Sequence, residues 1–362
     1  MHGRCIQRLV TVGDAHLTRD ANTALVIDGQ GRKQTALIER GAATFAVPRA
    51  FTVLASVVSA EQMPVAARDE RAVAANLMDK PPAPGSIVSE SRDAALGLTR
   101  LTLSNGVKVI LKPTDFRNDQ VLMSAVRFGG QMLFGEEDAY TSRYASSIVA
   151  SMGLKDYSPV DLQNVLAGKS ASVRVGLGSN TDIVSGSAGS SDIETMLQLV
   201  HLQFNGVRRD PDLYKSFIAR QVDAARNAMT QPELVFRDAI VTTLYDNHPR
   251  VARTPRPEDF AKVSMDRAVE IYKARFGSAK DLTFILVGSF DTARIKPLLA
   301  TYLASLPAAD IPVEAKDTGV RPVTGVVRKE VRSGSEAKSN VSINFTGKAQ
   351  FSEEEQMRFH AL

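Results

Sequence analysis

Hydrophobic and polar residues alternate along two neighbouring stretches of the chain, Thr99–Leu103 and Val107–Leu111. Alternation with a period of two is typical of a β-strand that is buried on one face only. The stretches are separated by Ser104-Asn105-Gly106, and Asn-Gly between alternating runs indicates a hairpin whose turn residues both accept positive φ. We therefore predict a β-hairpin here, followed by a third strand over Gln120–Phe128.

Apolar residues then recur at the spacing of an α-helix. Tyr144, Ile148 and Met152 share one helical face, and Gly153 follows them as a helix stop. Ser191 and Glu194 have the spacing of a capping box, which predicts another helix start. The remaining predicted elements are a short helix from Ser158-Pro159, strands over Ala171–Leu177 and Thr181–Ser187, helices from Asp210, Pro232 and Ser264, a buried strand over Leu282–Val287 and a helix over Asp291–Leu303.

The order of these elements indicates the fold class. Strands, helices, strands and helices follow one another, and one strand and one helix close the series. We predict an α+β domain, with a largely antiparallel sheet and helices packed on one face. After residue 322 the pattern starts again, with strand-like alternation over Val326–Val331 and Val341–Phe345 and a capping-box spacing from Ser352 to Glu355. A second, similar domain is expected to begin there and to be cut short.

Proline-rich and weakly patterned segments divide the chain. The run Pro81-Pro82-Ala83-Pro84-Gly85 can enter neither a helix nor a central strand. Short strands are predicted near the N-terminus at Val10–Val12, Ala24–Ile27 and Phe51–Val58. The predicted organisation is a poorly defined N-terminal segment (1–63), a linker (64–95), the α+β domain (96–307), a linker (308–322) and the truncated start of a second α+β domain (323–362).

Composition sets only wide limits on function. The 362 residues are 44% hydrophobic and 23% charged, with a net charge of +4 and both signs interspersed. This balance, without a basic stripe or an aromatic-basic module, argues against a nucleic-acid partner. Cys5 is the only cysteine, so neither an intrachain disulfide nor a cysteine-based zinc site is expected. Residues 1–14 lack the apolar core of a signal peptide, and the apolar stretch 43–58 is too short to span a bilayer.

The sequence offers few groups that could perform chemistry. A helical zinc pair needs two histidines four residues apart with a glutamate between them, and no two histidines lie within five residues. The histidines are His2, His16, His201, His248 and His360. The acidic run Glu136-Glu137-Asp138 precedes a helix, where negative charge favours the helix dipole. The Gly-Ser segments near residues 178 and 186 are not nucleophile elbows, and Gly129-Gly130 is not a phosphate loop.

The ordered set of these segments resembles the insulinase/pitrilysin family of inverted-motif zinc metallopeptidases, and within it the periplasmic bacterial zinc-protease branch. The resemblance is carried by Thr102–Leu111, by the strand that ends at Gly129-Gly130, and by Tyr272–Pro307 with its Val287-Gly288-Ser289-Phe290-Asp291. It covers residues 80–362.

The resemblance implies repeated α+β domains in two halves that close around a peptide. One half carries His-x-x-Glu-His and a further glutamate for zinc, and the other half is degenerate. Aligned on Gly129-Gly130, the motif region of this chain runs from Glu136 to Ile148 and offers Tyr140, Arg143 and Tyr144 instead of ligands. The chain is therefore expected to be a fragment of a degenerate, non-catalytic half, without catalytic, cofactor-binding or metal-binding residues of its own.

The same resemblance implies the partners. A zinc-bearing half or subunit would perform proteolysis, and this chain would supply chamber wall and contacts to a peptide or unfolded protein substrate. Main-chain pairing at an exposed sheet edge is the physical route to such contacts. The family points to the periplasm, whereas the chain as it stands, without a signal peptide, would remain cytoplasmic. The alternatives are a stand-alone structural or assembly subunit of the same fold, or a truncated gene product without activity.

Overall fold

The computed structural model describes residues 77–347 and 352–361, together with the backbone of four short strands near the N-terminus. The chain divides into two compact units, residues 1–71 and 72–362. The strands of the first unit pair antiparallel in chain order: β1 (Thr11–Val12), β2 (Ala15–Leu17), β3 (Thr23–Ile27) and β4 (Lys33–Leu37). Strands are thus present where they were predicted at Val10–Val12 and Ala24–Ile27, and the one predicted at Phe51–Val58 lies outside the described residues.

The second unit is built on a seven-stranded sheet with the order β5-β6-β7-β11-β8-β10-β9. Neighbouring strands are antiparallel, except that β11 runs parallel to β7. This mostly antiparallel sheet with helices confirms the α+β fold class. The strands are β5 (Ile87–Asp93), β6 (Leu98–Leu103), β7 (Lys108–Pro113), β8 (Gln120–Phe128), β9 (Ala171–Leu177), β10 (Thr181–Gly189) and β11 (Thr283–Gly288).

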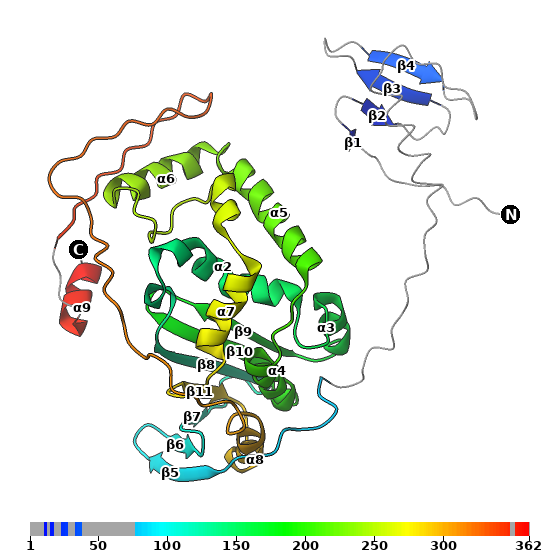
Figure 1. The fold of residues 1–362 in the computed structure, drawn as a ribbon, viewed down its shortest axis with the longest axis vertical. Coiled ribbons are helices and arrows are strands. Elements are labelled where there is room, and N and C mark those ends of the chain that lie inside the picture. The colour runs from blue at the N-terminus through cyan, green and yellow to red at the C-terminus, as the bar shows by residue number, and fades with distance from the viewer. Residues whose placement is uncertain are drawn as a thin grey trace. The chain divides into compact units, whose positions relative to one another are not determined.

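The helices of this unit lie on one side of the sheet, and α2, α4 and α7 stand in front of β8 to β11 in Figure 1. Three short 3-10 helices lie in the connections, η1 (Gln131–Leu133) and η2 (Glu136–Asp138) between β8 and α2, and η3 (Pro257–Lys262) between α6 and α7. The α-helices are α2 (Ala139–Met152), α3 (Pro159–Val165), α4 (Ile193–Asn205), α5 (Pro211–Ala228), α6 (Pro232–Leu244), α7 (Met265–Phe276), α8 (Thr292–Tyr302) and, beyond the sheet, α9 (Glu353–Ala361).

The two faces of the sheet differ in burial because side chains alternate along each strand. On β11, Phe284 and Leu286 are fully buried under the helices, whereas Ile285 between them is 42% exposed. The buried side chains join the helices in one core, to which Ile148 and Met152 of α2, Met196 and Val200 of α4, and Tyr272 and Phe276 of α7 contribute. The opposite face carries exposed apolar residues, namely Leu122, Val126, Phe128, Ile183 and Ile285.

The predicted hairpin is present, but its turn differs from the expected one. The amide of Leu103 donates to the carbonyl of Val107 at 2.8 Å, so Ser104, Asn105 and Gly106 form the loop. Only Gly106 has a positive φ (+82°), and Asn105 does not. The Asn105 side chain instead donates to the carbonyls of Leu303 and Leu306, which ties the hairpin to the end of α8.

Most predicted helix starts are capped as expected, but the start of α4 is not. Its N-cap is Asp192, and no side chain caps it, so the capping box of Ser191 and Glu194 is wrong. The Glu194 carboxylate accepts from the Tyr302 hydroxyl at 2.7 Å, and Asp192 accepts from the amide of Ser170 at 2.9 Å. Both carboxylates therefore make tertiary contacts in place of the local ones.

Two segments differ from the sequence prediction in opposite ways. Ile87–Asp93, placed in a linker, is strand β5, which pairs with β6 and is held by an ion pair between Glu90 and Lys296. Val326–Val331 and Val341–Phe345, predicted as strands, have no strand structure. Most of their apolar side chains are exposed, and no described strand pairs with their backbone.

Candidate functional site

The start of α2 carries the residues that the sequence places where a zinc motif would be. Tyr140 lies in the first turn of the helix and is 9% exposed, and Arg143 follows one turn later. The acidic run before the helix does not cap it. Asp138 instead accepts hydrogen bonds from the guanidinium of Arg267, the shortest at 2.7 Å, while Glu136 is an exposed side chain 3.8 Å from His248.

Cationic side chains surround the ring of Tyr140. The Arg143 and Arg253 guanidinium carbons lie 5.4 and 5.9 Å from the ring centroid, and the Lys262 ammonium lies 5.2 Å from it. These distances are within the range of cation–π attraction. Arg253 also donates to the Tyr140 hydroxyl at 2.9 Å. We refer to Tyr140, Arg143, Arg253 and Lys262, together with Arg250, whose carbonyl accepts from Arg143 at 3.4 Å, as the Tyr140 cluster.

Some arginines in this region are paired within the fold. Arg253 binds Asp259 at 2.8 Å, and Arg256 binds Asp238 at 3.2 Å. Both carboxylates are buried and also accept backbone amides, Asp259 from Arg256 and Asp238 from Thr254. These pairs hold the segment between α6 and α7 to itself and to α6, and the bond from Arg253 to the Tyr140 hydroxyl joins it to α2.

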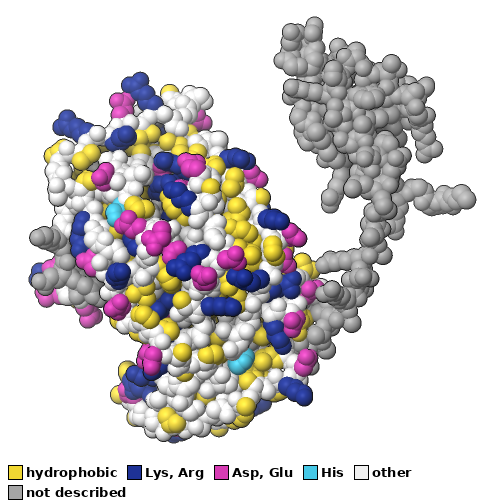
Figure 2. Space-filling model, viewed as in Figure 1, with side chains coloured by type: hydrophobic (Ala, Val, Ile, Leu, Met, Phe, Trp, Pro, Cys, Tyr) yellow, Lys and Arg dark blue, Asp and Glu magenta, His cyan; other side chains and the backbone are white. Residues whose placement is uncertain are grey.

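Other cations of the Tyr140 cluster have no such partner. Within the described residues, Arg143, Arg250 and Lys262 have no carboxylate oxygen within 4.0 Å of their charged nitrogens. Arg143 donates only to the carbonyls of Pro249 and Arg250, at 3.3 and 3.4 Å. Arg250 donates to the carbonyl of Phe134 at 2.7 Å, but its Nε is buried and has no hydrogen-bond partner. Figure 2 shows Lys and Arg side chains interspersed with Asp and Glu over this helix-covered face.

Burial and charge shift the acidities of this cluster. Burial raises the pKa of the Tyr140 hydroxyl, so it stays protonated. Burial also acts to raise the pKa of Asp259, but hydrogen bonds from the Arg256 amide, Arg253 and Tyr140 outweigh it and hold that pKa below its usual value. Three cationic side chains, Arg143, Arg253 and Lys262, therefore lie around a neutral phenol.

This arrangement does not fit a zinc ion. Zinc binds thiolate, imidazole and carboxylate groups, whereas the side chains that converge on Tyr140 are mainly guanidinium and ammonium groups that repel a cation. Among the residues that the structure describes, no three His, Cys, Asp or Glu side chains gather in a way that could hold a metal. His201 lies apart on α4, beside the carbonyl of Tyr302, and burial lowers its pKa.

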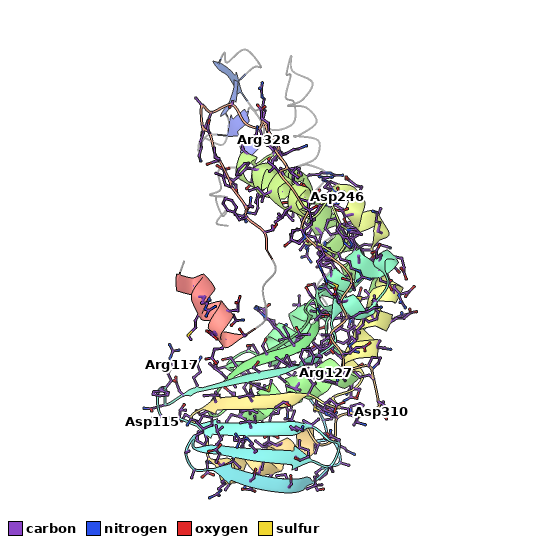
Figure 3. The ribbon with its side chains drawn as sticks, turned by 90° about the vertical axis from the view of Figure 1, so that its left-hand side faces the viewer. Asp115, Arg117, Arg127, Asp246, Asp310 and Arg328 are labelled. Atoms are coloured by element: carbon purple, nitrogen blue, oxygen red, sulfur yellow. The ribbon has the colours of Figure 1, made fainter. Side chains whose placement is uncertain are left out.

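A second charged group, which the sequence analysis did not find, lies inside the end of the sheet. Asp182 on β10 binds Arg127 of β8 at 2.8 Å and Arg275 of α7 at 2.7 Å, and all three side chains are at most 2% exposed. Arg127 also donates to the carbonyls of Ser278 and Lys280, and Arg275 to that of Pro312. Figure 3 shows Arg127 at the same end of the sheet as Asp310, which pairs with Lys280.

This buried triad (Arg127, Asp182 and Arg275) explains the glycine pair that follows β8. A Cβ on Gly129, where φ is +155°, would lie 2.2 Å from Nη2 of Arg275. A Cβ on Gly130 would lie 2.4 Å from the carbonyl oxygen of Gly178, and the Gly130 amide donates to Asp182 at 3.0 Å. Both glycines are thus required by close packing around the triad, without a ligand.

Strand β9 forms an open edge of the sheet. The Gly178 amide donates to the Thr181 carbonyl, and the Gly189 amide donates to the Ser170 carbonyl. The even-numbered residues of β9 are therefore those whose amides and carbonyls point toward β10. Because hydrogen-bonded and non-hydrogen-bonded pairs alternate, the amides and carbonyls of Val173 and Val175 point away from the sheet. No described strand pairs with them. The opposite edge, β5, carries Glu90, Arg92 and Asp93, which discourage pairing, whereas Arg174 is the one charged residue of β9.

The described helices include none that is long and apolar enough to cross a membrane.

A comparison with models of known protein families finds no match. Among curated proteins, the chain is 28% identical over 254 residues to the zinc protease PQQL-like of Arabidopsis thaliana, which covers 70% of this chain and 24% of that protein. It is 24% identical over 233 residues to the probable zinc protease PqqL of Escherichia coli, covering 64% of this chain and 25% of that one. The chain thus spans about a quarter of the length of these relatives.

Solved structures share the fold. The periplasmic protease PqqL from Escherichia coli superposes with a TM-score of 0.58 at 22% identity, over 76% of this chain and 30% of that one. The ferredoxin protease FusC, solved with Arabidopsis ferredoxin, gives a TM-score of 0.56 at 18% identity, over 78% and 31% of the two chains. An inactive peptidase domain from Pseudomonas fluorescens gives 0.50 at 14% identity, over 61% and 53%. At these identities the superpositions establish the fold alone.

Proposed function

This chain is related in sequence and fold to zinc peptidases of the insulinase/pitrilysin family. We propose that it is a non-catalytic part of such an enzyme and that it contacts the peptide while a zinc-bearing half cleaves it. The observation that carries this proposal is the open edge of β9, with the Val173 and Val175 amides directed outward. An extended peptide can add to such an edge through main-chain hydrogen bonds, which tolerate many sequences.

The cationic start of α2 supports the non-catalytic part of the proposal. The helix that would hold zinc presents Tyr140 and Arg143, and its neighbours Arg253 and Lys262 add positive charge. An inactive peptidase domain with the same fold, described above, agrees with this assignment. In the full assembly, zinc would be bound by the catalytic half, and this chain would form part of the chamber wall around the substrate.

The relatives support a proposal for the location and the substrate class. PqqL of Escherichia coli is a periplasmic protease, and FusC is a ferredoxin protease whose mutant was solved in complex with Arabidopsis ferredoxin. We therefore propose the periplasm as the site of action and a peptide or unfolded protein as the substrate. A stand-alone structural subunit of the same fold would not need the open edge of β9.

Binding of fluorescent peptides to the purified full chain tests the proposal. A capped, extended peptide of about ten neutral residues should bind, and the same peptide with N-methyl groups on alternate residues should bind at least about tenfold more weakly, because it has lost its donors on one edge. Placing the N-methyl groups one residue out of phase provides the matched control. Equal binding of all three peptides, or of none, would exclude pairing at the sheet edge.

A further inference from the structure

The Tyr140 cluster carries more positive charge than the fold neutralises. Arg253 is paired with Asp259, but Arg143, Arg250 and Lys262 have no carboxylate within 4.0 Å among the described residues. We propose that this cluster binds a carboxylate group of the peptide substrate. The inference deepens the function proposed above and rests on it for the identity of the ligand as a peptide.

Arg250 is the cation of the cluster whose hydrogen bonds within the fold are incomplete. Its Nη2 donates to the Phe134 carbonyl, while its Nε is buried without a partner. Leaving a buried donor without a hydrogen-bond partner costs about 1–3 kcal/mol in stability, and more for a charged group. Native structures therefore contain few such donors. Arg143 contacts the backbone of the same residue, since its Nη2 donates to the carbonyl of Arg250 at 3.4 Å.

The chemistry of the cluster selects a carboxylate. Guanidinium groups present paired N–H donors that match the two oxygens of a carboxylate, and such charge-assisted bonds are about twice as strong as neutral ones. Lys262 is exposed and can reach a ligand from the solvent side. The nearby acids do not fill this role, since Asp238 and Asp259 are buried in their own pairs and Glu136 lies beside His248.

A peptide can supply a carboxylate from an acidic side chain or from its C-terminus. Three acetylated, fluorescent peptides with one neutral core distinguish these sources: one with two glutamates and an amidated end, one neutral with a free C-terminus, and one neutral and amidated. We expect one of the carboxylate peptides to bind the full chain about five- to tenfold more tightly than the neutral amidated peptide. Raising the salt from about 50 to about 500 mM should reduce this preference.

Paired variants show whether the preference comes from the cluster. Arg143→Gln combined with Lys262→Gln should abolish it, while binding of the neutral peptide stays unchanged. Arg220→Gln combined with Lys273→Gln removes the same charge from exposed positions on α5 and α7 and should leave the preference intact. Loss of the preference in both double variants would mean that net charge alone attracts the peptide, and would overturn the site.

A small ligand separates this inference from the proposed function. N-acetyl-glutamate amide should raise the melting temperature of the full chain, and the Arg143→Gln/Lys262→Gln variant should not respond. If no peptide binds but this response is present, the carboxylate site holds and the function at the β9 edge fails. If peptides bind through their main chain with no carboxylate preference, the function stands and the carboxylate site is wrong. Absence of both effects overturns both.

Discussion

The two arginine groups of this chain differ in how their charge is balanced. In the buried triad, Asp182 accepts from Arg127 and Arg275, and carbonyl groups take up further donors of both guanidinium groups. In the Tyr140 cluster, Arg143 and Arg250 face carbonyls and a ring, and one buried Nε has no partner. Desolvation lowers the pKa of Arg127 inside the sheet, and its bonds to Asp182 oppose that shift.

The comparison separates structural charge from charge that is available for binding. A buried ion group is retained only where every donor is satisfied, because each unmet donor costs free energy. The triad meets this condition and joins β8, β10 and α7. In the Tyr140 cluster, Arg143 and Arg250 are half-buried and Lys262 is exposed, so water can screen charge that no carboxylate of the described residues balances.

Removing the shared carboxylate should have the largest effect. Asp182→Asn leaves two buried guanidinium groups without a counter-charge, and we expect a loss of about 3–5 kcal/mol in unfolding free energy. Urea unfolding followed by circular dichroism measures it. Asp212→Asn, at an exposed residue on α5, provides the control and should change little. A loss below about 1 kcal/mol would show that the triad does not hold the sheet together.

Crowding the triad from the backbone side should have the next largest effect. Gly129→Ala places a Cβ 2.2 Å from Arg275 Nη2, at a φ of +155°, and should cost about 2–3 kcal/mol. Gly168→Ala is the matched control. Gly168 also has a positive φ, +78°, but a Cβ there meets nothing within 4 Å, so the cost should stay near 1 kcal/mol. Similar costs at both positions would attribute the effect to φ alone, not to the triad.

Two arginines around the same ring test the difference within the Tyr140 cluster. Arg253→Gln deprives buried Asp259 of its partner and should cost about 1–2 kcal/mol. Arg143→Gln removes a cation without a carboxylate partner and should change the unfolding free energy by less than about 0.5 kcal/mol. Thermal unfolding of the two variants at one pH is the measurement. If Arg143→Gln costs as much as Arg253→Gln, its charge is structural and is not held available for a ligand.

Acid titration should give the smallest effect. The folded state holds the pKa of Asp259 below its usual value, so its stabilising contribution is present above the unfolded pKa of about 3.9. That contribution is lost as the pH falls through the lower pKa of the folded state. The unfolding free energy of Asp259→Asn should therefore fall less steeply below pH 4 than that of the parent chain. Identical slopes in urea titrations between about pH 5 and pH 2 would show that Asp259 is not stabilised by its partners.

Much of the fold could be predicted from local patterns. Alternation located β6, β7 and β8, and helical spacing with Gly153 located α2. Strand β5 was missed because its polar residues, exposed at a sheet edge, carry no alternation. The segments after residue 322 do alternate, but a strand also needs a partner for its backbone groups, and alternation alone does not report one.

The charged groups were harder to predict, although one signal was present. Alternate residues of β8 point into the core, namely Val121, Met123 and Ala125, and Arg127 is the next residue in this series. On β10, Asp182 points to the same side of the strand as the buried Val184. A charged residue in the buried phase of a strand requires a partner. The Tyr140 cluster gave no comparable signal, because Arg250, Arg253 and Lys262 reach α2 only through the loop between α6 and α7.

The position of β11 in the sheet has a consequence for the synthesis of the chain. This strand lies between β7 and β8, yet it begins 155 residues after β8 ends, at Thr283 compared with Phe128. At about 5–20 residues per second, a ribosome needs on the order of ten to thirty seconds to produce that stretch. For this time the inner edges of β7 and β8 lack their shared neighbour. Native pairing at the centre of the sheet is therefore delayed until nearly the whole domain has left the ribosome, and in that interval its apolar strands depend on protection from aggregation.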